Sequence, residues 1–308
     1  MGNKVLIIVG PTAVGKTQLS IELAQYFNGE IISGDSMQVY RNLDIGTAKI
    51  THKEMQNIKH YLIDCCEIDE RWSVAEFIKA SSQYIDEITK KNKLPFIVGG
   101  TGFYVQALLD NFQLGKDKYD ENLKVRNEWI EYSKKNGKRA LWDELNKVDS
   151  KAAKKIPISN ERRVVRALEV YNETGEKFSN QKDVRNKDFD PLIIGLTTKR
   201  EKLYERINQR VDLMLIEGLE TEARRVYETG NVELPAAKGI GYKEFYPYFR
   251  GEYSYQRAVE LIKQNSRHYA KRQLTWFRNK MDVIWFDLIE KPEETEKIKK
   301  VITEWIQK

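Results

Sequence analysis

Apolar residues in the first part of the chain fall into short runs separated by longer amphipathic segments. The short runs are rich in β-branched residues, as is typical of buried strands, and the longer segments carry apolar residues at helical spacing. We predict strands at residues 5–9, 30–33, 60–64 and 94–98, and helices at residues 18–27 and 74–91. This alternation is typical of an α/β fold with a parallel sheet and helical crossovers.

The strand pattern is interrupted in the middle of the chain. Residues 113–190 are highly charged but only mildly basic, and helical patterns appear around residues 123–135 and 161–174. Strand patterns return at residues 192–197 and 283–286, and a closing helix is predicted at 293–307, after Pro292. We interpret residues 1–112 and 191–308 as the core and residues 113–190 as a mainly helical insertion domain.

The composition excludes several classes of protein. None of the apolar runs approaches the roughly 20 residues needed to cross a bilayer, and the N-terminal residues do not form a signal peptide. We therefore expect a cytoplasmic protein without a membrane partner. The two cysteines, Cys65 and Cys66, are adjacent, which is neither a zinc-ligand spacing nor a disulfide framework. The net charge of +6 is compatible with an anionic partner.

The loop after the first predicted strand matches GxxxxGK[ST] in full and leads into a predicted helix. It consists of Gly10, Pro11, Thr12, Ala13, Val14, Gly15, Lys16 and Thr17. In such a P-loop the backbone N–H groups and the helix N-terminus hold phosphate oxygens, while Lys16 neutralises charge and Thr17 can ligate Mg²⁺. A chance match is the alternative, and the correctly placed strand and helix argue against it.

A P-loop indicates a polyphosphate ligand and leaves the reaction open. Kinases and NTPases transfer or hydrolyse a phosphoryl group on such a loop. The same loop could instead stabilise a departing diphosphate while the carbon attached to it is attacked.

Asp35 follows the second predicted strand, which places it at the carboxyl edge of the sheet beside the P-loop. Ligands of open α/β sheets bind at this edge. A carboxylate there could accept a proton from a nucleophile or hold Mg²⁺, and a helix N-cap is the structural alternative.

Several sequence blocks resemble the signature blocks of the bacterial tRNA dimethylallyltransferases. They are GPTAVGKT at 10–17, DSMQVYRNLDIGTAK at 35–49, VGGTGFY at 98–104, NERRVVRALE at 160–169, RINQR at 206–210, GIGYKE at 239–244 and AKRQLTWFR at 270–278. They span nearly the whole chain in the expected order. No zinc-finger spacing follows the core, unlike in eukaryotic relatives that carry a C-terminal finger.

The resemblance implies a P-loop NTPase-like fold and transfer of a dimethylallyl group from dimethylallyl diphosphate to N6 of the adenosine 3′-adjacent to the anticodon. By matching position, Asp35 would be the general base. The other catalytic residues would be Lys16, Thr17, Thr101 and Arg210, with Mg²⁺ on Thr17 bridging diphosphate oxygens. Contacts to the tRNA anticodon stem-loop would come from Asp35, Ser36, Met37, Gln38, Thr101, Asn160, Arg162, Arg163, Arg166, Lys238, Gly239, Ile240, Gly241, Tyr242 and Lys243.

Arg210 has a structural alternative. Arg206 and Arg210 stand four residues apart on a predicted helix that also carries acidic residues, and a solvated ion-pair face is common in such a helix. The resemblance favours a catalytic role.

A basic helix is predicted near the C-terminus, where residues 263–281 contain no acidic residue. Lys263, Arg267, Lys271 and Arg278 fall within an arc of roughly 80° on this helix. We expect Arg267, Lys271 and the neighbouring Arg272 to bind RNA phosphates, with Tyr269 and Trp276 as stacking surfaces if they are exposed. A merely solvated basic face is the alternative.

Three other functions remain open from the sequence. An adenylate dimethylallyltransferase would use the same chemistry on a free nucleotide, but it would not need the large insertion and the basic helix. A P-loop kinase or NTPase would use ATP. A noncatalytic RNA-binding protein would not need intact Lys16, Thr17 and Asp35. We expect the protein to be a monomer.

Overall fold

The computed structural model describes residues 2–112, 119–180 and 186–308. The chain divides into two compact units: Met1–Leu109 together with Asn186–Lys308, and Asp110–Arg185. The predicted insertion, residues 113–190, has limits close to those of the second unit. Residues 113–118 and 181–185 of that insertion lie outside the described part of the chain.

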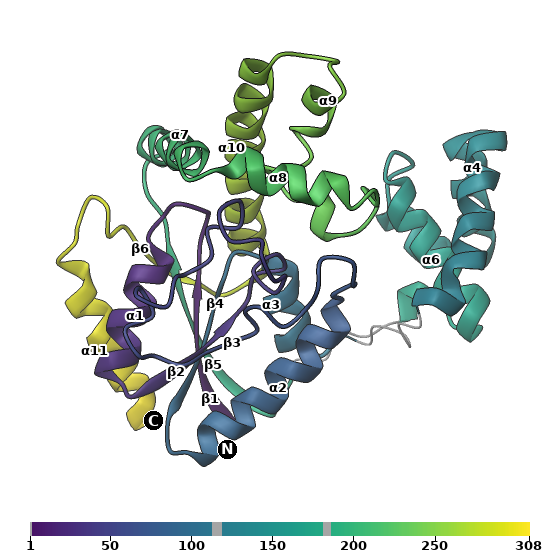
Figure 1. The fold of residues 1–308 in the computed structure, drawn as a ribbon. Coiled ribbons are helices and arrows are strands. Elements are labelled where there is room, and N and C mark those ends of the chain that lie inside the picture. Colours follow the sequence, from purple (N-terminus) through teal and green to yellow (C-terminus); the bar gives the residue numbers. More distant parts are fainter. Residues whose placement is uncertain (1, 113–118, 181–185) are drawn as a thin grey trace. The chain divides into compact units, whose positions relative to one another are not determined.

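The first unit contains a six-stranded sheet in which every neighbouring pair is parallel. The strand order is β3-β2-β4-β1-β5-β6 (Figure 1). The strands are β1 (Asn3–Val9), β2 (Gly29–Ser33), β3 (His60–Tyr61), β4 (Leu94–Gly99), β5 (Phe189–Leu196) and β6 (Ile284–Phe286). The predicted α/β class with a parallel sheet is confirmed.

Two predicted strands have different limits in the structure. The strand predicted at residues 60–64 is only two residues long, because Leu62 (φ 59°) and Asp64 (φ 52°) have left-handed backbone, which ends the extended conformation. The strand predicted at residues 192–197 begins earlier, at Phe189, since residues 189–191 pair with residues 3–5 of β1.

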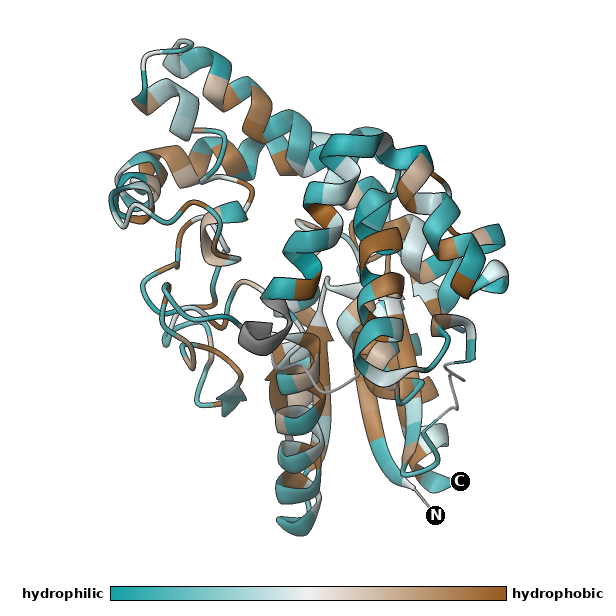
Figure 2. Ribbon diagram, turned by 90° about the vertical axis from the view of Figure 1, so that its right-hand side faces the viewer, coloured by the Kyte–Doolittle hydropathy of each residue, from teal (hydrophilic) through white to brown (hydrophobic). Residues whose placement is uncertain are grey.

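Helices cover both faces of the sheet, as in Figure 1. Val5, Ile7 and Val9 of β1 belong to a core shared with α2 (Val74–Lys90) and α3 (Gly102–Leu109). The intervening Leu6 and Ile8 belong to a second core, shared with α1 (Lys16–Tyr26) and α11 (Glu294–Gln307). Because successive side chains of a strand point to opposite faces, β1 supplies both cores. Figure 2 shows the strands as predominantly hydrophobic and the helices as striped.

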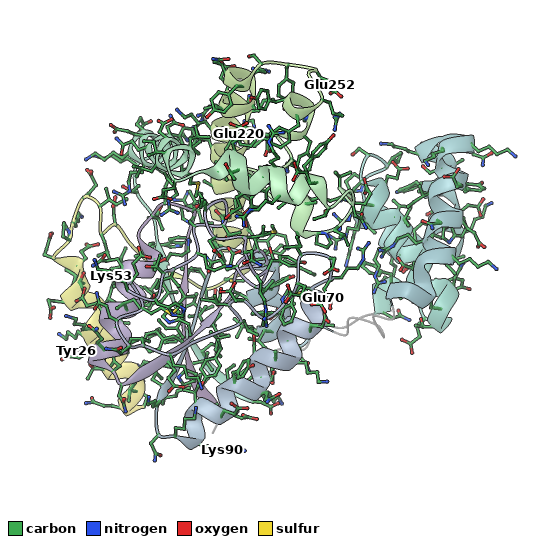
Figure 3. All side chains as sticks on the ribbon, viewed as in Figure 1. Tyr26, Lys53, Glu70, Lys90, Glu220 and Glu252 are labelled. Carbon is green, nitrogen blue, oxygen red and sulfur yellow. The ribbon has the colours of Figure 1, made fainter. Side chains whose placement is uncertain are left out.

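The closing helix α11 packs on the sheet through Ile298 and Ile302, both fully buried. On the outer surface Tyr26 of α1 (Figure 3) is 64% exposed. Lys299 of α11 lies over its ring, 5.1 Å from the ring centroid. The predicted helix at residues 293–307 is confirmed. Among the described helices, none offers an apolar stretch that could cross a bilayer.

Four helices lie beyond the carboxyl ends of the strands (Figure 1). They are α7 (Arg200–Ile216), α8 (Leu219–Glu228), α9 (Tyr246–Phe249) and α10 (Tyr255–Lys280), and a short turn η2 (Ala236–Lys238) follows α8. Ser254 caps α10 by accepting a hydrogen bond from the Arg257 backbone N–H. These helices surround the edge at which ligands of such sheets bind.

The second unit is helical in its described part. It contains α4 (Tyr119–Val148), α5 (Ser150–Lys155), α6 (Glu161–Thr174) and the turn η1 (Phe178–Asn180). Its core includes Leu141 and Leu145 of α4 and Val164 and Leu168 of α6. Gly137, at φ 86°, bends α4. The helix predicted at residues 161–174 coincides with α6, and the one predicted at 123–135 is part of the longer α4.

Candidate active site

Three loops meet at the carboxyl edge because their strands are neighbours in the order β2-β4-β1. The P-loop follows β1, Asp35 follows β2, and Thr101 follows β4. A Cβ atom on Gly99 would lie 2.3 Å from the backbone oxygen of Gly34, so only glycine allows the ends of β2 and β4 to approach this closely. The three loops therefore border one cavity.

The P-loop has the backbone geometry of an anion site. Gly10 (φ 149°), Ala13 (φ 64°) and Gly15 (φ 103°) have positive φ, and α1 begins at Lys16. The first N–H groups of a helix have no intrahelical partner, and the helix dipole favours an anion there. Thr12, Lys16 and Thr17 line the cavity.

The remaining P-loop residues contribute through their backbone. The side chains of Ala13 and Val14 are buried, so only their peptide groups are available to a ligand. Pro11 has no N–H group. Its carbonyl oxygen accepts a hydrogen bond from Lys16 Nζ at 2.8 Å, and that of Gly10 accepts one at 3.0 Å.

Lys16 lies in a positive environment. Burial and, to a smaller extent, the charge of the neighbouring Arg210 lower the pKa of its ammonium group to about 8, while Asp35 opposes the shift. A bound anion would favour the charged form again, so the loop is adapted to a multiply charged phosphate ligand.

Two arginines of α7 reach the P-loop. Arg206 Nε donates a hydrogen bond to Ala13 O at 2.9 Å, and Arg210 Nη1 donates one to Thr12 Oγ1 at 3.4 Å. Burial, followed by the charge of Arg206, lowers the pKa of Arg210. The interpretation of Arg210 as part of a solvated ion-pair face is wrong, because Arg210 lines the cavity.

Asp35 lines the same cavity as Lys16 and Arg210. Its Oδ1 accepts hydrogen bonds from the backbone N–H groups of Met37 (2.8 Å) and Gln38 (3.4 Å). The capping role considered for Asp35 is therefore present in a turn, not at a helix. Burial is the largest influence on the Asp35 carboxyl and raises its pKa, which makes the carboxylate a stronger base.

Thr101 joins the loops after β2 and β4. Its Oγ1 accepts a hydrogen bond from the Ser36 backbone N–H at 3.1 Å. This contact holds Ser36 and the preceding Asp35 against the β4 loop.

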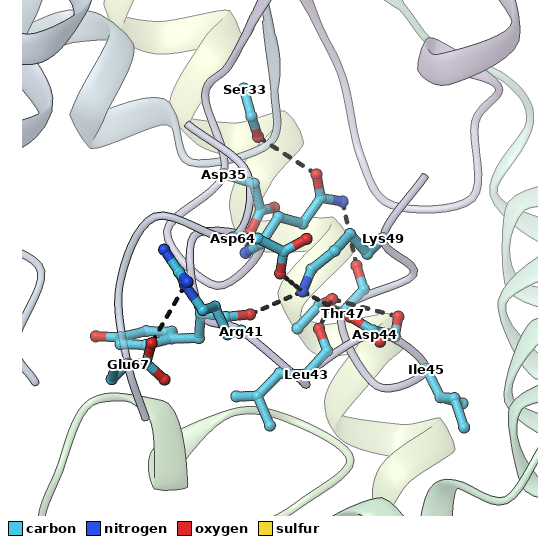
Figure 4. A network of polar contacts seen from close by, with 12 residues as sticks. Ser33, Asp35, Arg41, Leu43, Asp44, Ile45, Thr47, Lys49, Asp64 and Glu67 are labelled. Carbon is cyan, nitrogen blue, oxygen red and sulfur yellow. Dashed lines mark hydrogen bonds and ion pairs between the residues drawn. The ribbon is translucent and has the colours of Figure 1, made fainter. Parts of the chain in front are cut away.

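Gln38 fixes the segment that follows. Its Oε1 accepts a hydrogen bond from Ser33 Oγ at 3.3 Å, and its Nε2 donates to the carbonyl oxygens of Thr47 and Ala48, both at 3.3 Å. The same segment is held by Lys49, whose Nζ lies 2.6 Å from carboxylate oxygens of both Asp44 and Asp64 (Figure 4).

Glu222 of α8 also holds the loop that contains Asp44, Ile45 and Gly46. No signal in the sequence pointed to Glu222. The residue is 2% exposed, and its carboxylate accepts hydrogen bonds from the backbone N–H groups of Asp44, Ile45 and Gly46 at 2.8–3.0 Å. Tyr242 OH donates to it at 2.7 Å. Four hydrogen bonds satisfy this buried charge and fix Gly46 at the cavity wall.

The prediction that Tyr242 contacts tRNA is wrong. Its side chain is fully buried and its hydroxyl is bound to Glu222, so it cannot reach a macromolecular ligand. The prediction failed because its neighbours in the GIGYKE block do face the cavity. They are Gly239, Ile240, Gly241 and Lys243, and Lys238, which precedes the block, also lines the cavity.

The cavity, of about 400 Å³, combines a polar and an apolar lining. Lys16, Thr17, Asp35 and Arg210 provide charged and hydroxyl groups. The apolar lining comes from α7, α10 and loop residues, and includes Met37, Ile50, Ile63, Val211, Met214, Ile240 and Ile262. Such a lining suits a ligand with an anionic head and a short apolar tail.

The basic arc predicted on α10 is partly used within the protein. Lys263 Nζ lies 2.5 Å from Asp212 Oδ1, and Arg267 Nη1 donates to Asn208 Oδ1 at 2.6 Å, so both side chains bind α7. Lys271 and Arg272 are exposed. Ile262, Ala270 and Phe277 of the same helix are buried.

Neither aromatic residue considered for RNA stacking is fully exposed. Tyr269 lines the cavity, and Trp276 is half-buried against Gly102 and Phe103.

The candidate RNA-binding residues of the second unit lie at the start of α6. Asn160 caps the helix by accepting a hydrogen bond from the Arg163 backbone N–H. Arg162 and Arg163 are exposed. Arg166 binds the buried Glu169, with Nη1 3.1 Å from Oε1.

The family described as IPP transferase matches residues 38–280. The chain belongs to this family. The tRNA dimethylallyltransferase of Ligilactobacillus salivarius is 60% identical to it over 99% of this chain and 100% of that protein. The corresponding protein of Enterococcus faecalis is 53% identical over 99% of this chain and 98% of its own length.

Solved structures agree with this assignment. The full-length tRNA isopentenylpyrophosphate transferase of Bacillus halodurans is 45% identical, with a TM-score of 0.75 over 99% of this chain and 97% of that one. A eukaryotic dimethylallyltransferase, solved acting on tRNA, is 30% identical with a TM-score of 0.79, covering 97% of this chain and 78% of that one. This member of the family therefore has the P-loop NTPase-like core predicted from its sequence.

The Lys16 pKa of about 8 predicts how diphosphate binding depends on pH. Only protonated Lys16 attracts the anion, so the affinity should fall as pH rises through about 8, by up to roughly tenfold per pH unit. Calorimetric titration with inorganic diphosphate between pH 7 and 9.5 measures this affinity. The variant Lys16→Arg keeps its charge and corrects for ionisation of the ligand. Parallel profiles for the two proteins would contradict the prediction.

Proposed function

We propose that the protein is a tRNA dimethylallyltransferase. It transfers the dimethylallyl group of dimethylallyl diphosphate to N6 of the adenosine 3′-adjacent to the anticodon and releases diphosphate. The observation that carries the proposal is the single cavity in which a P-loop, a buried carboxylate and an apolar lining meet. A phosphoryl-transfer site would not require the apolar lining.

The donor half of the reaction uses the P-loop. The N–H groups at the start of α1, the Lys16 ammonium and the Arg210 guanidinium hold the diphosphate while the C1–O bond breaks and its electron pair leaves with the diphosphate. Since these cations are fixed before the reaction, they stabilise the developing charge without reorganisation. The apolar residues of the cavity exclude water from the dimethylallyl carbon.

The acceptor half uses the loop after β2. Adenine N6 is a poor nucleophile because its lone pair is delocalised into the ring. As N6 forms its bond to C1, Asp35 accepts the N6 proton, and the raised pKa of this carboxyl favours the transfer. Thr101 and the Ser36–Gln38 segment hold the nucleoside against Asp35.

A magnesium ion fits this donor set. The Thr17 hydroxyl and the Asp35 carboxylate line the same cavity. Among the described residues there is no group of three or more His, Cys, Asp or Glu that could hold a metal. Mg²⁺ often binds through one or two protein oxygens together with phosphate oxygens and water, which matches such a site. When bound, the ion neutralises charge on the diphosphate.

The anticodon stem-loop would bind along α10 and the helical unit. Lys271 and Arg272 are exposed on α10, and Arg267 retains further N–H groups beyond the one bound to Asn208. In the helical unit, Arg162 and Arg163 are exposed at the start of α6. Many phosphate contacts are needed, because unstacking the target base costs a few kcal/mol.

Product analysis tests the function directly. The protein is incubated with dimethylallyl diphosphate, Mg²⁺ and unmodified tRNA, and the nucleosides are analysed by mass. We expect dimethylallyladenosine 3′ of the anticodon and no requirement for ATP. Prenylation of AMP in place of tRNA would instead indicate an adenylate dimethylallyltransferase, and consumption of ATP with a phosphorylated product a kinase.

Asp35→Asn tests the general base. The amide cannot accept the N6 proton, so single-turnover transfer should slow by roughly 10²-fold or more, while tRNA affinity changes less than about twofold. Rapid-quench measurement gives the rate, and filter binding gives the affinity. Glu67→Gln, at an exposed carboxylate, is the control. Transfer by Asp35→Asn at the wild-type rate would exclude this role.

The exposed pair Lys271 and Arg272 tests the RNA surface. Replacing both with alanine should weaken tRNA binding and reduce the slope of log K against log salt by about two, since each phosphate contact contributes about one unit. Binding is measured at several salt concentrations. The double variant Lys297→Ala and Lys300→Ala changes the net charge equally on α11 and should leave the slope unchanged. Equal changes in the salt slope for the two double variants would argue against RNA binding by Lys271 and Arg272.

A further inference from the structure

Gln273 is a buried polar residue on α10 that connects two of the cavity loops. It is 5% exposed. Its Oε1 accepts a hydrogen bond from the Thr12 backbone N–H at 2.9 Å, and its Nε2 donates one to the Gly100 carbonyl oxygen at 2.9 Å. The first contact reaches the P-loop after β1 and the second reaches the loop after β4.

The two partners fix the orientation of the Gln273 amide. A backbone N–H can only donate and a carbonyl oxygen can only accept, so neither contact survives if the amide is turned over. An aliphatic side chain would lose both contacts. A glutamate would keep an acceptor for Thr12 but would place a second carboxylate oxygen against the Gly100 oxygen. Substitutions of Gln273 can therefore remove both hydrogen bonds or only the one to Gly100.

The surroundings of Gln273 leave it little freedom. A Cβ atom on Gly100 would lie 2.1 Å from Gln273 Nε2, so the backbone approaches this side chain as closely as a glycine allows. Tyr269, one turn earlier on α10, lines the same cavity as Gln273. Thr101 accepts the Ser36 N–H, and Thr12 accepts from Arg210.

These contacts form a continuous chain from Arg210 of α7 to Ser36, the residue beside Asp35. It runs from Arg210 through Thr12, Gln273, the Gly100–Thr101 turn and Ser36. In this chain of contacts, the side chain that links the P-loop to the loop after β4 is Gln273 of α10.

We propose that Gln273 is a positioning residue that sets the distance between the site for the diphosphate and the site for the nucleoside. It acts through Thr12 on the P-loop and through Gly100 on the turn that carries Thr101. The inference rests on the proposed function for the division of the cavity into these two sites. A displacement of about 1 Å between reacting groups can cost roughly 10² in rate, so a fixed spacing has a large kinetic effect.

The test compares Gln273→Met, Gln273→Glu and the control Gln264→Met, which replaces an exposed glutamine of the same helix. The measurements are the Kd of inorganic diphosphate, kcat and the donor KM for prenyl transfer, tRNA affinity and Tm. Diphosphate binding needs no activity, so the effect on the P-loop can be measured even if the proposed function is wrong.

Gln273→Met loses both contacts. We expect it to weaken diphosphate binding by about tenfold and to lower kcat by about 10²-fold, with tRNA affinity within about twofold of wild type. Gln273→Glu retains the contact to Thr12. It should bind diphosphate within about twofold of wild type while kcat still falls by about tenfold or more.

Three results would overturn the inference. They are diphosphate affinity and kcat of Gln273→Met equal to those of Gln264→Met, wild-type kcat for Gln273→Glu, or equal losses of diphosphate affinity in both position-273 variants. If Gln273→Met is unfolded at the assay temperature, Gln273→Glu tests the inference alone. A general loss of folding would lower both kcat and diphosphate affinity, whereas the inference requires a lower kcat with nearly unchanged diphosphate affinity.

Discussion

The parallel hydrogen bonding of β4 to both β1 and β2 is the constraint on which the site depends. Loops that follow neighbouring parallel strands emerge at the same edge, so the P-loop, Asp35 and Thr101 are brought together by the sheet itself. The fit is close enough that a Cβ atom on Gly99 would clash with the backbone of Gly34. Helices α7, α8 and α10 then add Arg210, Glu222 and Gln273 around a cavity whose position the strands have already determined.

Burial acts against the charged form of both the cations and the carboxylate of the cavity. It lowers the pKa of Lys16 and Arg210 and raises that of Asp35, so each group is less stable in its charged form than it would be in water. A diphosphate restores favourable surroundings to the cations. Asp35 is left as a base with increased proton affinity beside the nucleoside. These opposed shifts suit a reaction in which an anion leaves as a proton is taken up.

The sequence predicted the parts of this site that depend on local pattern. The P-loop, the strand before Asp35 and the helix α6 have local signals, and the resemblance added Arg210 and Thr101. Glu222 and Gln273 could not be predicted, because an acid or an amide on a charged helix looks solvated until packing buries it. Tyr242 was misassigned because its neighbours face the cavity while its own side chain is buried. Lys263 and Arg267 have partners on α7 that only the tertiary fold supplies. β3 is shorter than predicted because Leu62 and Asp64 have left-handed backbone. Neither residue is a glycine, so the sequence carried no sign of this conformation.

The central claim is that one cavity holds the leaving diphosphate on the P-loop and the target adenine at Asp35. A crystal structure with a nonhydrolysable thio analogue of dimethylallyl diphosphate and an unmodified anticodon stem-loop measures this most directly. The account predicts diphosphate oxygens within hydrogen-bond distance of the Lys16 ammonium and the N–H groups at the start of α1, with adenine N6 within hydrogen-bond distance of Asp35. A diphosphate bound away from the P-loop, or an adenine N6 out of reach of Asp35, would contradict it.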